Sequence, residues 1–316
     1  ADVYFSFDPS TLFNQPVSGQ GKIQIRGKAI TDAAINLALG LNKFTASGRL
    51  GELESQINWA LNAPALGHIG YGIDGALSGS GTLSGPLDAM QGKIALTGQN
   101  FKVKDLIGAQ DLRINAEFGT TRSSKINTHI TAKQATLAGT HWTLLDFKTS
   151  GTWHSHILEA EAKSSHYHLT AQISGGITAA GGWLGMLQHL ENRGKKPFTL
   201  VGAASLKITS PDIFSVENLR LNIGEGQLTV KRFIKKYTHL ETDGSASHIP
   251  LNWLLSLSQT TDATIDSSLT IGGEWSVRAD HAVHGALHFY REDGDITLIG
   301  EENRFRFRLT GLDANA

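Results

Sequence analysis

The chain has 316 residues, of which 40% are hydrophobic and 18% are charged, and its formal net charge is −1 at pH 7. This balance excludes a strong field that would draw the chain to nucleic acid. The absence of Cys excludes disulfides, thiolate metal sites and cysteine nucleophiles. No apolar run approaches the ~20 residues that a membrane-spanning helix needs. No signal peptide is recognisable and the first residue is Ala1, so we expect the chain to be the middle part of a longer protein.

Short segments that alternate apolar with polar residues recur along the whole chain. In an extended chain, residues two apart share a face, so Ile114 and Phe118 lie on one side while Arg113 and Glu117 lie on the other. Gly, Pro, Asn or Asp interrupts the alternation about every 8 to 12 residues, which is typical of an all-β chain. In chain order the predicted strands are 22–26, 35–41, 57–61, 92–98, 101–104, 112–118, 125–130, 142–147, 157–162, 167–173, 205–209, 219–223, 227–231, 295–299 and 304–309.

Two stretches depart from this rhythm. In the first, residues 181–196, Trp183, Leu187 and Leu190 have helical spacing and Gly194 could end a helix, so the pattern fits a short amphipathic helix or a long loop. The second, residues 250–258, is a helical candidate because Pro250 is well placed in a first helical turn. We otherwise expect residues 1–316 to form one continuous segment.

The alternation predicts a long antiparallel sheet with one apolar and one wet face, and one or two short helices. About 25 strands at ~4.8 Å spacing would make a sheet on the order of 100 Å long. Open sheets of that size normally curl, split or close. The pattern fits an ordinary closed core and also a sheet curled into a U-shaped hydrophobic groove, which would need an apolar guest.

Signals for catalysis are weak. The pairs His154/His156 and His166/His168 share strand faces, and a third group lies near His288, but zinc sites need three or four convergent ligands. The glycine-rich stretch 79–85 lacks the ending of a phosphate-binding loop, and turn glycine explains it better. We therefore expect no enzyme, no metal and no cofactor. The basic residues of 231–236 fit either anionic headgroups or a solvated strand end.

Three passages resemble one known family. The first runs from Ile57 to Pro64 and continues in the Gly/Ser/Leu run to Pro86. The second contains Gly181-Gly182-Trp183-Leu184-Gly185, and the third begins at Ile249-Pro250-Leu251 and ends in the turn 291–295. Together they cover most of residues 50–300, and in this order they resemble the TamB family, the inner-membrane subunit of the translocation and assembly module. That family belongs to the AsmA-like group of bridge-like lipid-transfer proteins.

The resemblance implies a fold, a place and partners. It implies a β-taco sheet in the periplasm of a Gram-negative cell, carrying phospholipid acyl chains between the inner and outer membranes. It also implies an N-terminal helix that anchors the full-length protein in the inner membrane, and an outer-membrane Omp85-type barrel, TamA, as partner. The anchor and the barrel-facing segment are not recognisable in this sequence.

The groove would be lined by the apolar members of the alternating segments. These candidates are Ile23, Ile25, Leu37, Leu39, Ile94, Leu96, Ile114, Phe118, Leu206, Ile208, Leu219, Leu221, Ile223, Leu228, Val230, Ile296, Leu298, Phe305 and Phe307.

Two other functions fit the pattern. An assembly scaffold for outer-membrane and autotransporter β-proteins, as in protein secretion, would bind extended chains at its open sheet edges by β-augmentation. A secreted repetitive structure such as an adhesin passenger would show a tight, fixed repeat, and the uneven spacing argues against it.

Overall fold

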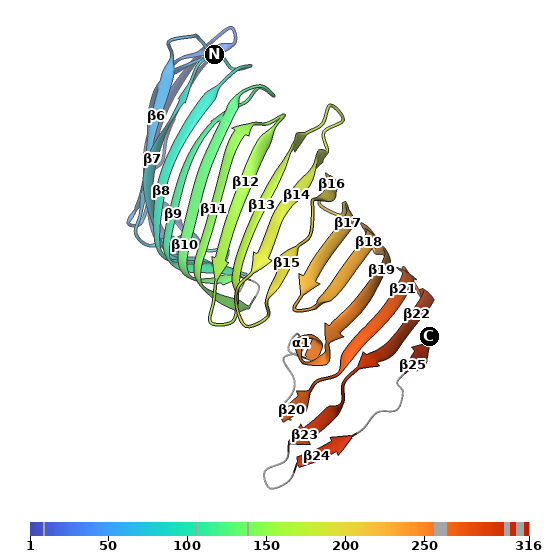
Figure 1. Cartoon of the computed structure of the whole chain (residues 1–316). Coiled ribbons are helices and arrows are strands. Elements are labelled where there is room, and N and C mark those ends of the chain that lie inside the picture. The colour runs from blue at the N-terminus through green and yellow to red at the C-terminus, as the bar shows by residue number, and fades with distance from the viewer. Residues whose placement is uncertain are drawn as a thin grey trace. The chain divides into compact units, whose positions relative to one another are not determined.

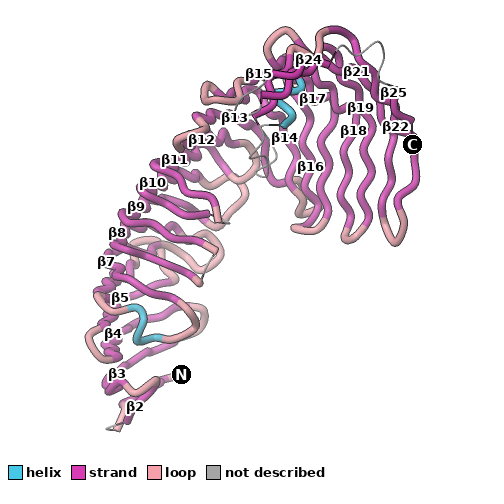
Figure 2. The backbone as a smooth tube through the Cα atoms, turned by 90° about the horizontal axis from the view of Figure 1, so that it is seen from below, coloured by secondary structure: helices cyan, strands magenta, loops and turns pink. Residues whose placement is uncertain are grey.

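The protein is described by a computed structural model that covers residues 1–8, 10–104, 106–137, 139–255, 264–299, 304–307 and 313–315. The chain forms two compact units, Ala1–Ser165 and His166–Ala316. In both units the paired strands are antiparallel and joined mainly by short turns. Within the described residues the helical segments, coloured cyan in Figure 2, are the 3₁₀-helix η1 (Leu66–Ile69) and helix α1 (Leu251–Leu255). The predicted all-β fold with long antiparallel pairing is confirmed.

The first unit is a single meander in which, from β2 onward, each strand pairs with the next. Its strands are β1 (Asp2–Ser6), β2 (Ser10–Leu12), β3 (Gln15–Arg26), β4 (Ala29–Leu39), β5 (Asn42–Leu50), β6 (Gln56–Ala63), β7 (Ile73–Ser84), β8 (Gln91–Val103), β9 (Ile107–Gly119), β10 (Lys125–Leu137), β11 (Thr140–Thr152) and β12 (His156–Lys163). β1 and β2 both pair with β3, and together they form the edge of the sheet. Figure 1 shows the strands β6 to β12 as one layer, bowed in the same direction.

The second unit repeats this design. Its strands are β13 (His168–Ile177), β14 (Trp183–Asn192), β15 (Phe198–Leu200), β16 (Ala204–Ser210), β17 (Ile213–Ile223), β18 (Gly226–Lys236), β19 (His239–Pro250), β21 (Thr270–Ala279), β22 (Val283–Asp293) and β25 (Asp313–Asn315). The short strands β15 and β16 both lie between β14 and β17, so they act as one interrupted strand. A separate small sheet contains β20 (Thr264–Ser267), β23 (Ile296–Ile299) and β24 (Arg304–Phe307).

Of the two predicted interruptions, one is a strand and the other contains a helix. The expectation of a helix or loop at 181–196 is wrong, because Trp183–Asn192 is strand β14. Its apolar residues satisfy helical spacing only because both faces carry them: Trp183 and Leu187 pair into the apolar face, whereas Leu184 is exposed on the other. The helix predicted from Pro250 is present as α1, although Pro250 itself is the last residue of β19.

The chain exposes far more surface than a globular protein. Its accessible area is 19300 Å². Two globular bodies of half its mass of 34.0 kDa would together expose about 15,000 Å². Among the described residues, Ile223 and Leu269 are the large hydrophobic side chains that are most fully buried. Each unit is therefore built around a sheet face and not around a closed core.

Candidate functional site

An unbroken apolar row crosses the first unit from β3 to β12. Directly paired residues of antiparallel strands point to the same face, so the register alone defines the row. In order across the ten strands it contains Gly19, Leu37, Phe44, Leu61, Gly79, Leu96, Ile114, Ile130, Phe147 and Ala160. Nine strand spacings of about 4.8 Å give it a length of about 43 Å.

A parallel row lies two residues along every strand. Its members are Gly21, Ile35, Ala46, Trp59, Gly81, Ile94, Ala116, Thr128, Thr149 and Leu158. Neither row contains an Asp, Glu, Lys or Arg. We call the surface formed by these two rows the apolar face of the first unit.

Large side chains on this face lie over glycines of the neighbouring strand. A methyl group built onto Gly81 would come within 2.6 Å of the Trp59 ring, so the ring occupies the space that the glycine leaves. The Phe118 ring covers Gly92 in the same way, and the Phe5 ring covers Gly21. This arrangement, known as aromatic rescue of glycine, makes one layer of side chains close-packed without a second sheet above it.

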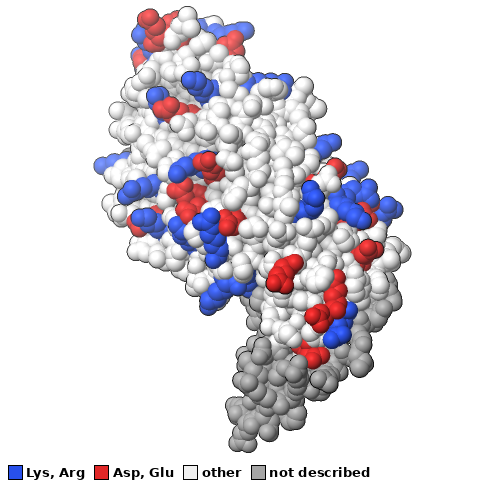
Figure 3. Space-filling model, in the orientation of Figure 1, with Lys and Arg blue, Asp and Glu red and all other residues white. Residues whose placement is uncertain are grey.

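The opposite face of the first unit is polar. Lys93 pairs with Glu117 across β8 and β9 at 3.1 Å, in an exposed ion pair. Asp146 accepts hydrogen bonds from His129 Nε2 at 2.8 Å and Thr131 Oγ1 at 3.0 Å. Partial burial raises the pKa of Asp146, but these two bonds, together with the charges of His129 and Lys148, outweigh it, and the pKa is lowered from its usual value. Figure 3 shows Lys, Arg, Asp and Glu intermixed, with wide uncharged areas between them.

The second unit carries its own apolar face. One row contains Gly185, Leu206, Val216, Phe233, Thr242, Val277 and Gly285. A second contains Leu200, Leu221, Leu228, Ala246, Gly273 and Phe289. Trp275 lies over Gly244 here, as Trp59 lies over Gly81 in the first unit.

Most predicted lining residues lie together within their own unit. The first unit brings to its apolar face Ile23, Ile25, Leu37, Leu39, Ile94, Leu96, Ile114 and Phe118, with Ile25 at the strand end beyond a register shift. The second unit brings together Leu206, Ile208, Leu219, Leu221, Ile223, Leu228 and Val230. Whether these residues contact lipid stays a prediction.

Four predicted lining residues lie elsewhere. Ile296 pairs with Phe307, and Leu298 pairs with Phe305, in the separate small sheet of the second unit. The side chains of Leu298, Phe305 and Phe307 lie outside the part of the chain that the structure describes. Trp59 also lies on the apolar face, between Ala46 and Gly81, and is not among the predicted lining residues. Its place in the alternating segment 57–61 is the signal that could have identified it.

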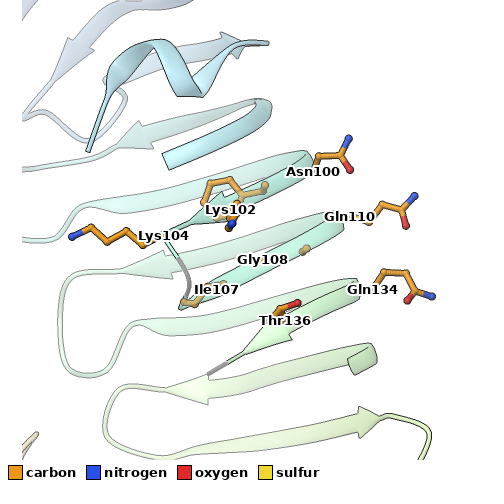
Figure 4. Close-up of a pocket in the computed structure, with 10 residues that line it drawn as sticks. Asn100, Lys102, Lys104, Ile107, Gly108, Gln110, Gln134 and Thr136 are labelled. Atoms are coloured by element: carbon orange, nitrogen blue, oxygen red, sulfur yellow. The ribbon is translucent and has the colours of Figure 1, made fainter. Parts of the chain in front are cut away.

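A hollow of about 560 Å³ lies at the ends of β8, β9 and β10. Figure 4 shows the amides of Asn100, Gln110 and Gln134 projecting in the same direction from these neighbouring strands. Asn100 and Gln134 have positive φ angles of 48° and 46°, because both strands bulge there. Besides these amides, the hollow is lined by Lys102 and Lys104 and by the apolar residues Phe101, Ile107 and Ala109, and its described lining contains no carboxylate.

The basic residues of 231–236 are partly engaged in ion pairs. Arg232 contacts Glu241 at 2.6 Å and Asp243 at 2.9 Å, and Ser276 Oγ donates to Asp243 at 2.6 Å. These bonds link β18, β19 and β21 on the polar face. Among the described residues, no group of three or more His, Cys, Asp and Glu side chains is placed to hold a metal ion. None of the described helices is long and apolar enough to span a membrane.

Comparison with known proteins gave one match. The family model described as "TamB, N-terminal domain" matches residues 10–194, which is more than half of the chain. No curated protein and no solved structure matches the chain.

Proposed function

Because the chain belongs to the TamB family, we propose that it is a segment of a lipid-transfer bridge whose apolar faces carry phospholipid acyl chains. One observation carries this proposal: an uncharged row of paired apolar residues runs across ten strands with no second layer described above it. An exposed apolar surface of this extent marks an interaction with an apolar partner. In this role the bridge lies in the periplasm, between an inner-membrane anchor and an outer-membrane barrel.

The physical benefit of such a face is large. Each CH₂ group that leaves water gains about 0.8 kcal/mol, so a lipid with roughly 30 of them faces a barrier of about 20 kcal/mol or more when it crosses water. A continuous apolar face removes most of that barrier. Because the rows of the first unit carry no charge, their contacts with acyl chains are weak and similar everywhere, which lets chains slide while headgroups stay in solvent. The proposed role needs no catalysis.

The absence of native Cys allows a direct test, because one introduced Cys is the only labelling site. Leu96 lies on the apolar face, and its neighbour Ala95 lies on the polar face of the same strand. We would attach an environment-sensitive fluorophore to Leu96→Cys and to the matched control Ala95→Cys, and then add phospholipid with spin-labelled acyl chains. Quenching at position 96 and not at 95 is expected. Equal quenching at both, or none at 96, refutes the proposal.

Assembly of outer-membrane β-proteins is the second candidate, and the edge of the first unit favours it. β1 pairs with β3 on one side only among the described residues, so its other edge is open to an added strand. In that role an extended peptide from a barrel protein would protect the β1 amides from hydrogen exchange and leave the fluorophore at position 96 unchanged.

A further inference from the structure

The turns along one rim of the first unit differ sharply from those along the other. Successive turns of a meander alternate between the two ends of the strands. We call the described residues of the turns 13–14, 40–41, 64–72, 104–106 and 138–139 the apolar rim; residues 105 and 138 lie outside the described ones. We call the turns 27–28, 51–55, 85–90, 120–124 and 153–155 the polar rim. Figure 2 shows the turns of this unit in pink along both edges.

Large exposed hydrophobic side chains gather on the apolar rim. Seven lie in its turns or directly beside them: Leu12, Phe13, Leu41, Tyr71, Leu106, Ile107 and Leu137. The polar rim, counted in the same way, exposes two, Leu53 and Leu87. Four of the seven, Phe13, Leu41, Tyr71 and Leu106, lie in the turns themselves, where Gly, Pro, Asn, Asp or Ser is usual.

Charge follows the opposite distribution. The described turn residues of the apolar rim contain one charged residue, Lys104. The turns of the polar rim contain five: Lys28, Glu52, Glu54, Asp88 and Arg122. Water therefore solvates the polar rim well, while the apolar rim loses little hydration when it is covered.

The longest turn of the apolar rim, 64–72, is anchored to the sheet. Asn42, which is buried, donates from Nδ2 to the Ala65 carbonyl at 2.8 Å and accepts from the Ala65 amide at 3.0 Å. Leu66 is buried beside this contact, while Tyr71 at the other end of the loop is 76% exposed and meets the Phe13 ring edge-to-face at 5.6 Å. The loop is thus fixed to the sheet at Ala65, while the rings of Tyr71 and Phe13 face outward together.

The spacing of these side chains indicates the kind of partner. Neighbouring turns on one rim are two strands apart, or about 10 Å, and the five turns span about 40 Å. A protein partner would need a matching pocket at each position, whereas a fluid layer fills the space between separate side chains. Phe and Leu are among the side chains that insert at the boundary between headgroups and acyl chains, and Tyr is enriched at the same membrane–water interface.

We propose that the apolar rim docks edge-on onto a lipid bilayer surface. The docking is driven by insertion of the exposed turn side chains and not by charge, so it is indifferent to anionic lipid. The inference does not depend on the proposed carriage of lipid, because a rim can dock whether or not the apolar face holds acyl chains.

The test is flotation of the full chain with phosphatidylcholine vesicles, with and without added phosphatidylglycerol. The variant Leu41→Ser/Tyr71→Ser/Leu106→Ser removes three side chains that are each more than 60% exposed. The matched control, Leu53→Ser/Leu87→Ser, removes the exposed side chains of the polar rim. Because each inserted side chain contributes part of its burial free energy, we expect vesicle binding to weaken at least about tenfold in the triple variant and to stay unchanged in the control.

Three results overturn the proposal: no binding by the unaltered chain, equal binding by the triple variant, or equal loss in the control. Sedimentation separates a further alternative. If the unaltered chain is a dimer that the triple variant converts to a monomer, without binding vesicles, the rim joins two copies of the chain and the proposal fails. Circular dichroism checks that the variants fold. Quenching at position 96 is measured in parallel, so failure of the rim and failure of the proposed lipid carriage are distinguishable.

Discussion

A charge placed on the apolar face of the second unit should exclude acyl chains locally while the protein still folds. Leu221 lies directly between Leu200 and Leu228 on that face, and the next residue, Asn222, points to the polar side. We therefore compare Leu221→Asp with Asn222→Asp, which adds the same charge one residue along the chain. Leu221 is half-buried, so its loss costs less than the roughly 1.5–3 kcal/mol of a fully buried side chain.

The effect on lipid is larger than the effect on folding. The new carboxylate keeps its water in the empty protein because the face is open, but an acyl chain that covers it must remove that water, at a cost of several kcal/mol. Since about 1.4 kcal/mol changes an equilibrium tenfold, a cost of about 3 kcal/mol lowers local occupancy at least about 100-fold. A fluorophore on Leu219→Cys, two residues away on the same face, reports this occupancy through quenching by spin-labelled acyl chains.

We expect quenching in the Asn222→Asp background and little in the Leu221→Asp background. Acidification that protonates the introduced carboxyl should restore quenching in the second. If Leu221→Asp folds and its reporter is quenched as strongly as in the control, acyl chains do not occupy this face.

Three further predictions concern stability. Gly81→Ala should lower the free energy of unfolding by about 1–3 kcal/mol, because its methyl group meets a backbone carbonyl and an indole ring. In the control Gly108→Ala the new methyl group has no atom closer than 3.8 Å. Thermal melting should show little effect of that control. The hydrogen bond from Ser276 holds the pKa of Asp243 below its usual value despite some burial. Asp243→Asn should therefore destabilise the protein at neutral pH. Urea titrations should show the difference in stability between the variant and the unaltered chain disappearing as the pH falls through the lowered pKa. Asn42→Ala should cost about 1–3 kcal/mol, seen as a lower melting temperature, because the backbone of the β6–β7 loop loses two hydrogen bonds; an unchanged melting temperature would show that water replaces them.

The sequence predicts strands and faces well because period-two alternation records directly which side of a strand is wet. Leu206 and Ile208, for example, lie on the apolar face as their alternation with polar neighbours requires. It does not predict which strands pair over long distances, since that depends on turns and bulges. Ile296 therefore belongs to a small separate sheet although its local pattern resembles that of the main strands. Strand β14 was missed because apolar residues on both of its faces remove the alternation on which the prediction depends.

The pairing of large rings with glycines explains how a single-layer sheet stays folded and still offers an apolar surface. A sheet normally covers its apolar face with a second layer. Here Trp59 lies over Gly81 and Trp275 lies over Gly244. Each ring therefore packs against the backbone of the neighbouring strand, and this contact replaces the one that a second layer would provide in a closed core. The face that remains is smooth and uncharged along the rows of the first unit. A rigid partner gains little from such a surface, whereas a fluid acyl chain can contact it anywhere along its length. Replacing either glycine should therefore impair folding and leave the chemistry of the surface unchanged. A charge on the face should change the chemistry of the surface and leave folding largely intact.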